Sequence, residues 1–226
     1  IPTYHRFSQL EQCIIRLKSQ QYKNFEVIIV EDGGNNKEAI LSISNELDIK
    51  YLILENKINV STKRNIGASK AQGKYLIFLD DDDSVTNSWL SDFVEVLTKK
   101  NADVAFCAVE LLSIKEKNKI IFPETAYPDE RGWGIFLAGA FVIKKDIFNS
   151  IYGYDEMLWY GENTELGIRL KLKINSKVFI NNINLTYNPS ASGGSKNIRN
   201  TFIANNHILA KHRDWFLKSP ILHFNY

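Results

Sequence analysis

The sequence predicts an α/β fold in which helices cover a mostly parallel sheet. Short apolar runs alternate with amphipathic segments through the first half of the chain, which is typical of parallel strands joined by helices. The apolar runs in 25–33 and 74–80 stop at acidic turn residues, as expected for buried strands followed by loops. No repeat or low-complexity linker divides the 226 residues. We therefore expect a single domain over 1–226, with halves at about 1–120 and about 121–226.

The elements of the first half follow from local periodicity. Apolar residues recur at helical spacing in 7–20, at Leu10, Cys13, Ile14 and Leu17. The segments that follow are predicted as strand 25–33, helix 37–47, strand 49–56, helix 61–73 ending at Gly73, strand 74–80, helix 87–100 capped by Asn87 or Ser88, and strand 102–111. Open α/β sheets bind ligands at the carboxyl ends of their strands. The acidic ends at 31–32 and 80–83 are therefore expected to face one crevice.

The second half is less regular and richer in aromatic residues. We expect a strand followed by a helix in 141–151, a helix from about Thr164, two short strand pieces in 177–189 and one long helix over 197–218. The pattern gives no further element between 122 and 140.

Composition limits the classes of function. A formal charge of +2 is too small to indicate a nucleic-acid partner, which usually requires a concentrated basic stripe. Both cysteines, Cys13 and Cys107, lie in apolar surroundings, which predicts buried free thiols and a reducing cytoplasm. No apolar run is long enough to span a bilayer.

Four consecutive aspartates, 80–83, follow a predicted buried strand. Carboxylates this close repel one another, so the cluster is favoured where a cation binds. Hard divalent cations take oxygen ligands and often share them with phosphates. An Asp-x-Asp here therefore predicts a Mn²⁺ or Mg²⁺ site that bridges a diphosphate; the alternative is a solvated turn that caps the next helix. Signatures of P-loops, dinucleotide folds, zinc sites and nucleophile elbows are absent.

Taken in order, several segments resemble family 2 inverting glycosyltransferases with the GT-A fold, over nearly the whole chain. These segments are IPTYHR at 1–6, VIIVEDGG at 27–34, STKRNIGASKAQGKYLIFLDDDD at 61–83, LAGAFVIKKDIFNSIYGYDE at 137–156, GENTELGIRL at 161–170 and NPSASGGSK at 188–196. The resemblance implies a metal-dependent enzyme that moves a sugar from a nucleotide-sugar, most commonly a UDP-sugar, to an acceptor hydroxyl. The implied setting is bacterial polysaccharide or glycolipid synthesis.

The resemblance also implies a donor site. Its expected contacts to the nucleotide-sugar are Pro2, Thr3, Tyr4, Arg6, Asp32, Lys63, Arg64, Asp80 and Asp81. Asp32 would accept a hydrogen bond from a base N–H, and Tyr4 would pack on the base. Lys63 and Arg64 would neutralise the diphosphate, with a solvated helix face as the alternative.

Within the aspartate run, the resemblance makes Asp82 the main metal ligand. Asp80 leans toward the ribose or sugar and is a second ligand, while Asp81 and Asp83 are expected to support or cap. Tyr187 stands where the family often has a histidine, so histidine help with the metal is not expected.

The catalytic base departs from the family pattern, which usually has Glu-Asp with the aspartate as base. Here the pair is Glu162-Asn163, and asparagine cannot accept a proton. Three hypotheses stay open. Glu162 acts as the base, which we favour; Asp155 or Glu156 reaches the acceptor; or Asn163 marks a nucleotide-sugar-binding module with impaired or no transfer activity.

Residues expected near the acceptor, a saccharide or lipid-linked saccharide, are aromatic or basic. Trp133, Trp159 and Tyr160 are predicted to stack on sugar faces, with core packing as the alternative. Glu165 and Arg169 are expected to hold their helix in place by packing or ion pairing. The C-terminal segment carries His207, Lys211, His212 and Arg213. This predicts a solvated basic face, or else a peripheral contact with anionic lipid at the inner face of the membrane.

Overall fold

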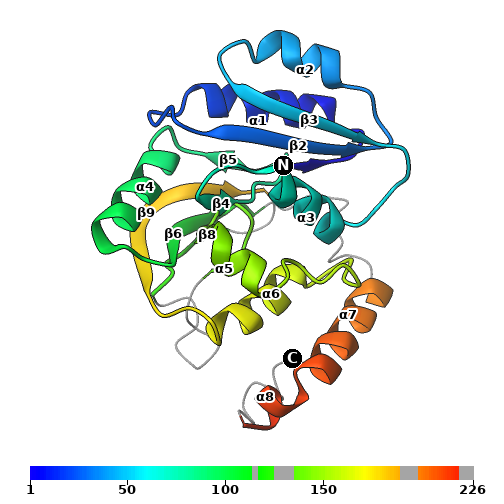
Figure 1. The fold of residues 1–226 in the computed structure, drawn as a ribbon, viewed down its shortest axis with the longest axis vertical. Helices are drawn as coiled ribbons and strands as arrows, with labels where there is room; N and C mark the ends of the chain where they lie inside the picture. Colours follow the sequence, from blue (N-terminus) through cyan, green and yellow to red (C-terminus); the bar gives the residue numbers. More distant parts are fainter. Residues whose placement is uncertain (114–116, 125–134, 189–197, 219–226) are drawn as a thin grey trace.

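The computed structural model describes residues 1–113, 117–124, 135–188 and 198–218, and these residues form two sheets with helices around them (Figure 1). One sheet has three strands and the other has six. The predicted α/β class is confirmed.

The first sheet contains β1 (Pro2–Thr3), β2 (Glu26–Asp32) and β3 (Asp48–Leu54), in that order and all parallel. Helices α1 (Phe7–Lys18) and α2 (Lys37–Ile43) join these strands and lie with them at the top of Figure 1. As its periodicity predicted, α1 buries its four apolar residues against the core. The three strands deliver their carboxyl ends to one edge.

Helix α3 (Val60–Lys70) packs against β1 and β2. It begins at Asn59, whose side chain accepts a hydrogen bond from the Thr62 backbone N–H at 2.8 Å. It ends at Lys70, three residues before the predicted end at Gly73, because Ala71 takes an extended conformation.

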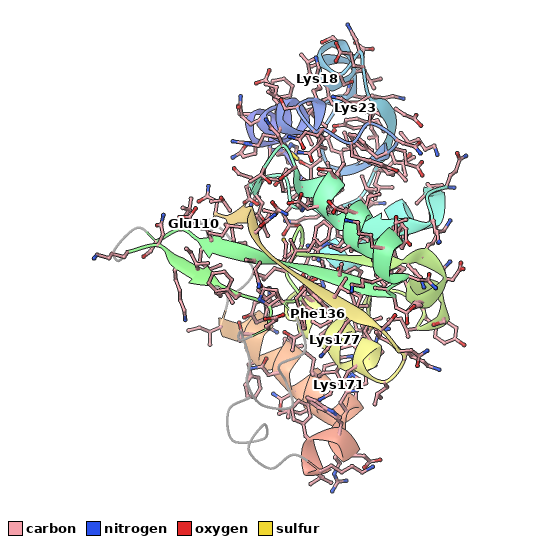
Figure 2. All side chains as sticks on the ribbon, turned by 90° about the vertical axis from the view of Figure 1, so that its left-hand side faces the viewer. Lys18, Lys23, Glu110, Phe136, Lys171 and Lys177 are labelled. Carbon is pink, nitrogen blue, oxygen red and sulfur yellow. The ribbon has the colours of Figure 1, made fainter. Side chains whose placement is uncertain are left out.

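The second sheet is mixed, which the sequence pattern did not predict. Its strands are β4 (Tyr75–Ile77), β5 (Ser84–Val85), β6 (Val104–Leu111), β7 (Lys119–Ile121), β8 (Phe141–Lys144) and β9 (Lys177–Tyr187). The order is β4-β8-β6-β9-β5, with β7 also beside β6. Of the described pairs, β6–β9 is parallel and the others are antiparallel. Figure 2 shows the β6–β7 hairpin, which carries Glu110, extending from the body.

Strand β9 is one strand instead of the two pieces expected. Its register against β6 shifts on both sides of Ala108, which gives β9 extra residues there. A bulge of this kind bends a strand and re-aims the side chains beyond it. The bend carries the end of β9 to β5 and to the aspartate turn, where the Asn188 N–H donates to Asp83 at 3.1 Å.

The remaining helices are α4 (Trp89–Lys100), α5 (Lys145–Ser150), α6 (Glu162–Lys171), α7 (Ile198–Lys211) and α8 (Arg213–Lys218). Helix α6 begins two residues earlier than predicted. The single long helix predicted over 197–218 is instead α7 and α8, separated at His212.

Buried side chains form three apolar clusters. The largest joins α1, α4 and the two sheets, and the second is aromatic and lies under α3, α5 and α6. A small third cluster holds α7 and α8 against α6 and includes Leu158, Ile168 and Ile208. Cys13 and Cys107 are buried free thiols, as predicted. In the part of the chain that the structure describes, no helix has the length and apolar character needed to cross a membrane.

Candidate active site

Helix α3 is the element on which the site is built, because its side chains reach both sheets and the loop that leads into α6. Lys63 is buried and donates to the backbone oxygen of Thr3 at 3.1 Å. Arg64, one residue further, extends to Asp80 and to Glu162. One helix therefore contacts the predicted donor residues and the predicted base.

The predicted base-packing residue, Tyr4, lies beside the glycine turn after β2. Its ring is 37% exposed. Gly33 has φ +73°, and a Cβ there would lie 2.8 Å from the ring of Tyr4. The ammonium of Lys57 lies 4.4 Å from the ring centroid. The turn therefore needs glycine, and Tyr4 beside it is only partly covered.

Asp32 and Lys63 pair with each other, which differs from the roles predicted for them. Asp32 is fully buried, and its two oxygens accept hydrogen bonds from the Lys63 ammonium and the Ile58 N–H. Both oxygens of Asp32 are thus hydrogen-bonded within the protein, and Lys63 forms an ion pair with it. The nucleobase and diphosphate roles of these two residues stay predictions, and the sequence does not show that Lys63 reaches the buried end of β2.

The structure resolves the register of the aspartate run by turning Asp81 toward β1. Its Oδ2 accepts a hydrogen bond from the Thr3 hydroxyl at 2.6 Å, and its Oδ1 accepts one from Arg6 at 3.1 Å. Both oxygens of Asp81 are thus used within the protein. Asp81 supports β1, and so does Pro2, which pairs with Val30 on β2.

The other three aspartates lie close together beside the end of β9. Asp82 accepts a hydrogen bond from Arg6 at 2.8 Å. Asp83 Oδ2 is buried, and among the residues that the structure describes none hydrogen-bonds to it. Burial and the neighbouring charges of Asp80 and Asp82 raise the pKa of Asp83 to about 8. Burial raises the pKa of Tyr187, and the negative charges of the same three carboxylates raise it further.

This group has the ligand chemistry for a hard divalent cation. The orphaned Asp83 oxygen is the kind of buried polar atom that requires a partner. Among the residues that the structure describes, no set of three or more His, Cys, Asp or Glu side chains is arranged to chelate a metal by itself. Asp82 and Asp80 instead form ion pairs with two different arginines, Arg6 and Arg64.

Arg64 is a buried bridge between two carboxylates, and its predicted role at the diphosphate stays a prediction. Its side chain is 1% exposed. Nη2 donates to Asp80 Oδ1 at 2.7 Å and Nη1 donates to Glu162 Oε1 at 2.8 Å. The guanidinium carbon lies 5.2 Å from the ring centroid of Tyr154. The predicted base, Glu162, therefore lies next to the aspartate group, as its role requires.

Asn163 also contacts Glu162. Its Nδ2 donates to Glu162 Oε1 at 3.2 Å, and its Oδ1 accepts from the Tyr154 hydroxyl at 3.0 Å. Burial raises the pKa of Tyr154, so the phenol keeps its proton. Tyr154 had no role in the sequence prediction, because its position in an aromatic-rich segment resembles ordinary core packing.

Helix α3 also holds the loop at 153–161 by its backbone. Asn59 and Ser61 donate to the backbone oxygens of Glu156 and Leu158, at 2.6 and 3.0 Å. The Asn65 side chain makes two hydrogen bonds to the backbone of Tyr154. It donates to the backbone oxygen at 2.9 Å and accepts from the backbone N–H at 2.8 Å. Sequence analysis missed these residues; the polar positions 59, 61 and 65 on an otherwise packed helix were the available signal.

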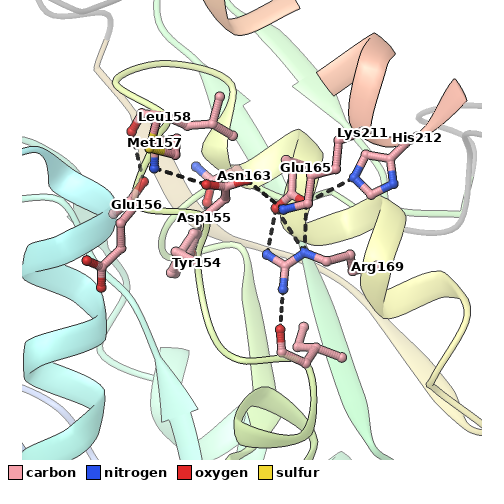
Figure 3. Close-up of polar contacts among 12 residues, drawn as sticks. Tyr154, Asp155, Glu156, Met157, Leu158, Asn163, Glu165, Arg169, Lys211 and His212 are labelled. Carbon is pink, nitrogen blue, oxygen red and sulfur yellow. Dashed lines mark hydrogen bonds and ion pairs between the residues drawn. The ribbon is translucent and has the colours of Figure 1, made fainter. Parts of the chain in front are cut away.

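Asp155, an alternative base in the sequence prediction, instead fixes α7 (Figure 3). It accepts hydrogen bonds from Lys211 and from the Met157 N–H, and His207 lies 2.9 Å away. Burial alone would raise the pKa of Asp155, but the contacts with Lys211 and His207 outweigh burial and lower it strongly. A carboxylate held this way is a poor proton acceptor.

Glu165 and Arg169 pair with each other, as expected, and α7 and α8 add to this pair. Arg169 donates to both oxygens of Glu165 and also to the backbone oxygen of Ile151 (Figure 3). Lys211 and His212 each lie 2.9 Å from Glu165. Lys211 is exposed, as a solvated basic face requires, but it, His207 and His212 also contact the acids of the loop and α6.

The predicted acceptor aromatics differ in exposure. Trp159 is 51% exposed in the loop before Glu162. Tyr160 packs partly buried against the small cluster under α7, so core packing accounts for it. Trp133 and the segment from 189 to 197 lie outside the described residues.

A cavity of about 580 Å³ lies between β2, α3 and β4. Its walls are mainly apolar, with Val27, Leu76 and Phe78 among them, and residues 80–83 do not line it. Arg64 and Lys63 do line it, so the cavity adjoins the site at α3.

Comparison with known proteins agrees with this geometry. The profile of glycosyl transferase family 2 matches residues 1–150. An uncharacterised glycosyltransferase of Haemophilus influenzae is 32% identical over 124 residues, 51% of this chain and 49% of that protein. The glycosyltransferase GlyG of Streptococcus pneumoniae is 27% identical over 180 residues, 67% of this chain and 58% of GlyG. The chain thus spans about half the length of these relatives.

Solved structures share the fold. TarS residues 1–349 from Staphylococcus aureus, in complex with UDP-GlcNAc, has a TM-score of 0.71 at 18% identity, over 86% of this chain and 59% of that one. The mannosyltransferase PcManGT from Pyrobaculum calidifontis, in complex with GDP-Man and Mn²⁺, has a TM-score of 0.72 at 13% identity, over 94% of this chain and 62% of that one. These likenesses confirm the GT-A fold. With the profile match over 1–150, they lead to one conclusion: the chain belongs to glycosyl transferase family 2.

Proposed function

We propose that this chain is a metal-dependent inverting glycosyltransferase that moves a sugar from a UDP-sugar to an acceptor hydroxyl. One observation carries the proposal: Arg64 joins Asp80 to Glu162. A carboxylate group suited to a metal–diphosphate and a carboxylate suited to proton transfer therefore lie on two sides of one cation. A sugar bound between them would have its leaving group on one side and its acceptor on the other.

The donor base is proposed to pack on the open ring of Tyr4. Solved relatives of the same fold hold UDP-GlcNAc or GDP-Man, and family resemblance favours uracil. For Asp32 to accept a hydrogen bond from a base N–H, Lys63 or the Ile58 N–H must first release one of the Asp32 oxygens. Arg6, whose side chain is 30% exposed and pairs with Asp82, is proposed to contact the diphosphate.

Asp82, Asp80 and the orphaned oxygen of Asp83 would hold a Mn²⁺ or Mg²⁺ ion. When bound, such an ion stabilises the negative charge that develops on a diphosphate leaving group. The protein's own part is to keep these carboxylates at the end of β4. Thr3 and Arg6 anchor Asp81 within that turn, and the Asn188 N–H anchors Asp83.

Transfer needs a base on the acceptor side, and we assign this role to Glu162. Its carboxylate accepts the proton of the acceptor hydroxyl as that O–H bond breaks. The acceptor oxygen forms a bond to the anomeric carbon from the face opposite the leaving group. The bond from that carbon to the phosphate oxygen breaks, and its electron pair leaves with the nucleoside diphosphate. One displacement inverts the anomeric centre.

The acceptor is proposed to be a saccharide or lipid-linked saccharide whose sugar stacks on Trp159. This side chain is exposed in the loop that leads to Glu162. Strands from both halves of the chain pair in the second sheet. That pairing supports a single unit in which about 1–120 binds the donor and about 121–226 binds the acceptor.

Thermal unfolding in the presence of UDP-, GDP- and dTDP-sugars, each with Mn²⁺ or with EDTA, tests this function. A ligand that binds the folded state raises the melting temperature by mass action. We expect stabilisation by UDP-sugars with Mn²⁺ and much less in EDTA. Stabilisation without donor hydrolysis or transfer would favour the alternative of a binding module, and no stabilisation by any donor would contradict both.

A further inference from the structure

We infer that Asn163 and Arg64 are positioning residues that fix one oxygen of Glu162, Oε1, so that the other oxygen, Oε2, receives the acceptor proton. This inference rests on the proposed function and adds to it the arrangement of the base. It also gives a reason for an asparagine where the family usually has its catalytic aspartate.

The first step is that both donors reach the same oxygen. Arg64 Nη1 lies 2.8 Å from Glu162 Oε1, and Asn163 Nδ2 lies 3.2 Å from it. Among the described residues, none donates a hydrogen bond to Oε2. The side chain of Glu162 is 12% exposed, so the carboxylate is largely enclosed and still reachable. One oxygen is held and the other is left for a substrate.

The second step is that the orientation of the Asn163 amide is set by its surroundings. A carboxylate only accepts hydrogen bonds, so the amide must turn its NH₂ group toward Glu162. Its oxygen then faces the Tyr154 hydroxyl, which donates to it at 3.0 Å. Tyr154 is itself held by Asn65 and by the ring of Phe78, whose centroid is 5.1 Å away.

The third step concerns charge. An aspartate at position 163 would place a second carboxylate against Glu162, and like charges at that distance oppose ionisation of both. The amide instead donates an N–H to the ionised base. Glu162 is also the first residue of α6, where the helix N-terminus favours a negative charge. Asparagine therefore suits a chain whose base is one residue earlier than the family pattern.

Hydrolysis of UDP-GlcNAc with Mn²⁺, with water as the acceptor, tests the role of Asn163. Asn163→Asp keeps the side-chain shape, removes the N–H and adds a charge. We expect kcat to fall at least about tenfold, the scale of a lost hydrogen bond to a charged group, with KM for UDP-GlcNAc nearly unchanged. The matched control is Thr164→Asp, which adds the same charge at the next, exposed position and should leave kcat unchanged.

An increase in kcat for Asn163→Asp would overturn the inference, because it would show that a carboxylate at 163 is the better base. An equal fall in both variants would also overturn it, because added charge alone would then explain the loss. No hydrolysis or transfer by the unmodified protein, with any donor, would count against the proposed function.

A second readout needs no activity. The side-chain amide of Asn163 can be followed by ¹⁵N NMR in the unmodified protein and in Glu162→Ala. We expect its N–H resonances to shift when the carboxylate is removed, and more than those of the exposed Asn206 amide. Unchanged Asn163 resonances would overturn the inference even if the enzyme hydrolyses UDP-GlcNAc.

Discussion

Asp80 and Glu162 accept hydrogen bonds from the same guanidinium, that of Arg64, at 2.7 and 2.8 Å. The two carboxylates come from different sides of the expected reaction, one at the donor and one at the acceptor. Arg64 is buried, so removing either carboxylate leaves its charge only partly compensated, which is costly in a low-dielectric interior. The donor and acceptor sides are therefore electrostatically linked.

Glu162→Gln should lower the turnover of a UDP-sugar by about a hundredfold or more, the usual scale for a general base. Donor affinity, measured by calorimetry, should change far less than turnover, because Arg64 keeps its ion pair with Asp80 in this variant. Glu156→Gln is the control, since Glu156 is a carboxylate of the loop before α6 and accepts a hydrogen bond from Asn65. Full turnover in Glu162→Gln together with a loss in Glu156→Gln would move the base to Glu156.

Arg6→Gln should tighten Mn²⁺ binding in the absence of nucleotide. Arg6 holds Asp82 and Asp81, and a metal must compete with it for Asp82. The gain should be at most about fivefold, because a partly exposed ion pair contributes at most about 1 kcal/mol. Calorimetric titration with Mn²⁺ measures the effect. Asp82→Ala should abolish Mn²⁺ binding, and the surface variant Glu95→Ala should leave it unchanged. Weaker Mn²⁺ binding in Arg6→Gln would refute the idea that Arg6 and the metal compete for Asp82.

Acid should loosen the contact of α7 with α6 through Glu165. Burial alone would raise the pKa of Glu165, but hydrogen bonds from His212, Arg169 and Lys211 lower it from 4.5 to about 2. A depressed folded-state pKa contributes stability above the unfolded value, and that stability is lost as pH falls from about 4.5 toward 2. Melting temperatures across this range should fall less steeply in Glu165→Gln.

At neutral pH, Glu165→Gln should itself cost about 3 kcal/mol or more, the scale for breaking a buried pair. If the melting temperatures of the unmodified protein and of Glu165→Gln fell in parallel with pH, Glu165 would not be the group that makes this contact sensitive to acid.

Two glycines should respond to alanine in opposite directions. Gly161 has φ +74°, and a Cβ there would lie 3.2 Å from Ile208 on α7, so Gly161→Ala should destabilise by about 1–2 kcal/mol. Gly67 lies inside α3, where a Cβ would make an ordinary 3.5 Å contact with Val30. Gly67→Ala should therefore stabilise by about 0.5–1 kcal/mol. Urea unfolding measures the change in the free energy of unfolding for both variants. An unchanged free energy of unfolding in Gly161→Ala would show that the turn before Glu162 does not require glycine.

Local sequence pattern predicted most elements, because periodicity and turn residues act within a few positions of one another. It gave α1 with its buried Leu10 and the strand–helix step at 141–151. It did not give the antiparallel pairs of the second sheet, because pairing direction depends on how distant segments pack.

The site divides in the same way. Glu162 was predicted from its motif and lies beside the aspartate group. The contact of Glu162 with Arg64 was not predicted. It spans 98 residues, and local spacing cannot indicate contacts between such distant positions. Lys211, likewise, was expected on a solvated basic face, and it also contacts Asp155 and Glu165. The sequence could not indicate these contacts, because the two partners lie far away in the chain.

An anomalous difference map from crystals grown with UDP and Mn²⁺ would show whether a metal binds at the aspartate turn. Data collected at the manganese absorption edge locate the ion without reference to activity. We predict a single strong peak within coordination distance of Asp82, with Asp80 or Asp83 and the diphosphate completing the ligands. UDP density with no anomalous peak at these carboxylates, or a peak elsewhere on the protein, would contradict the account.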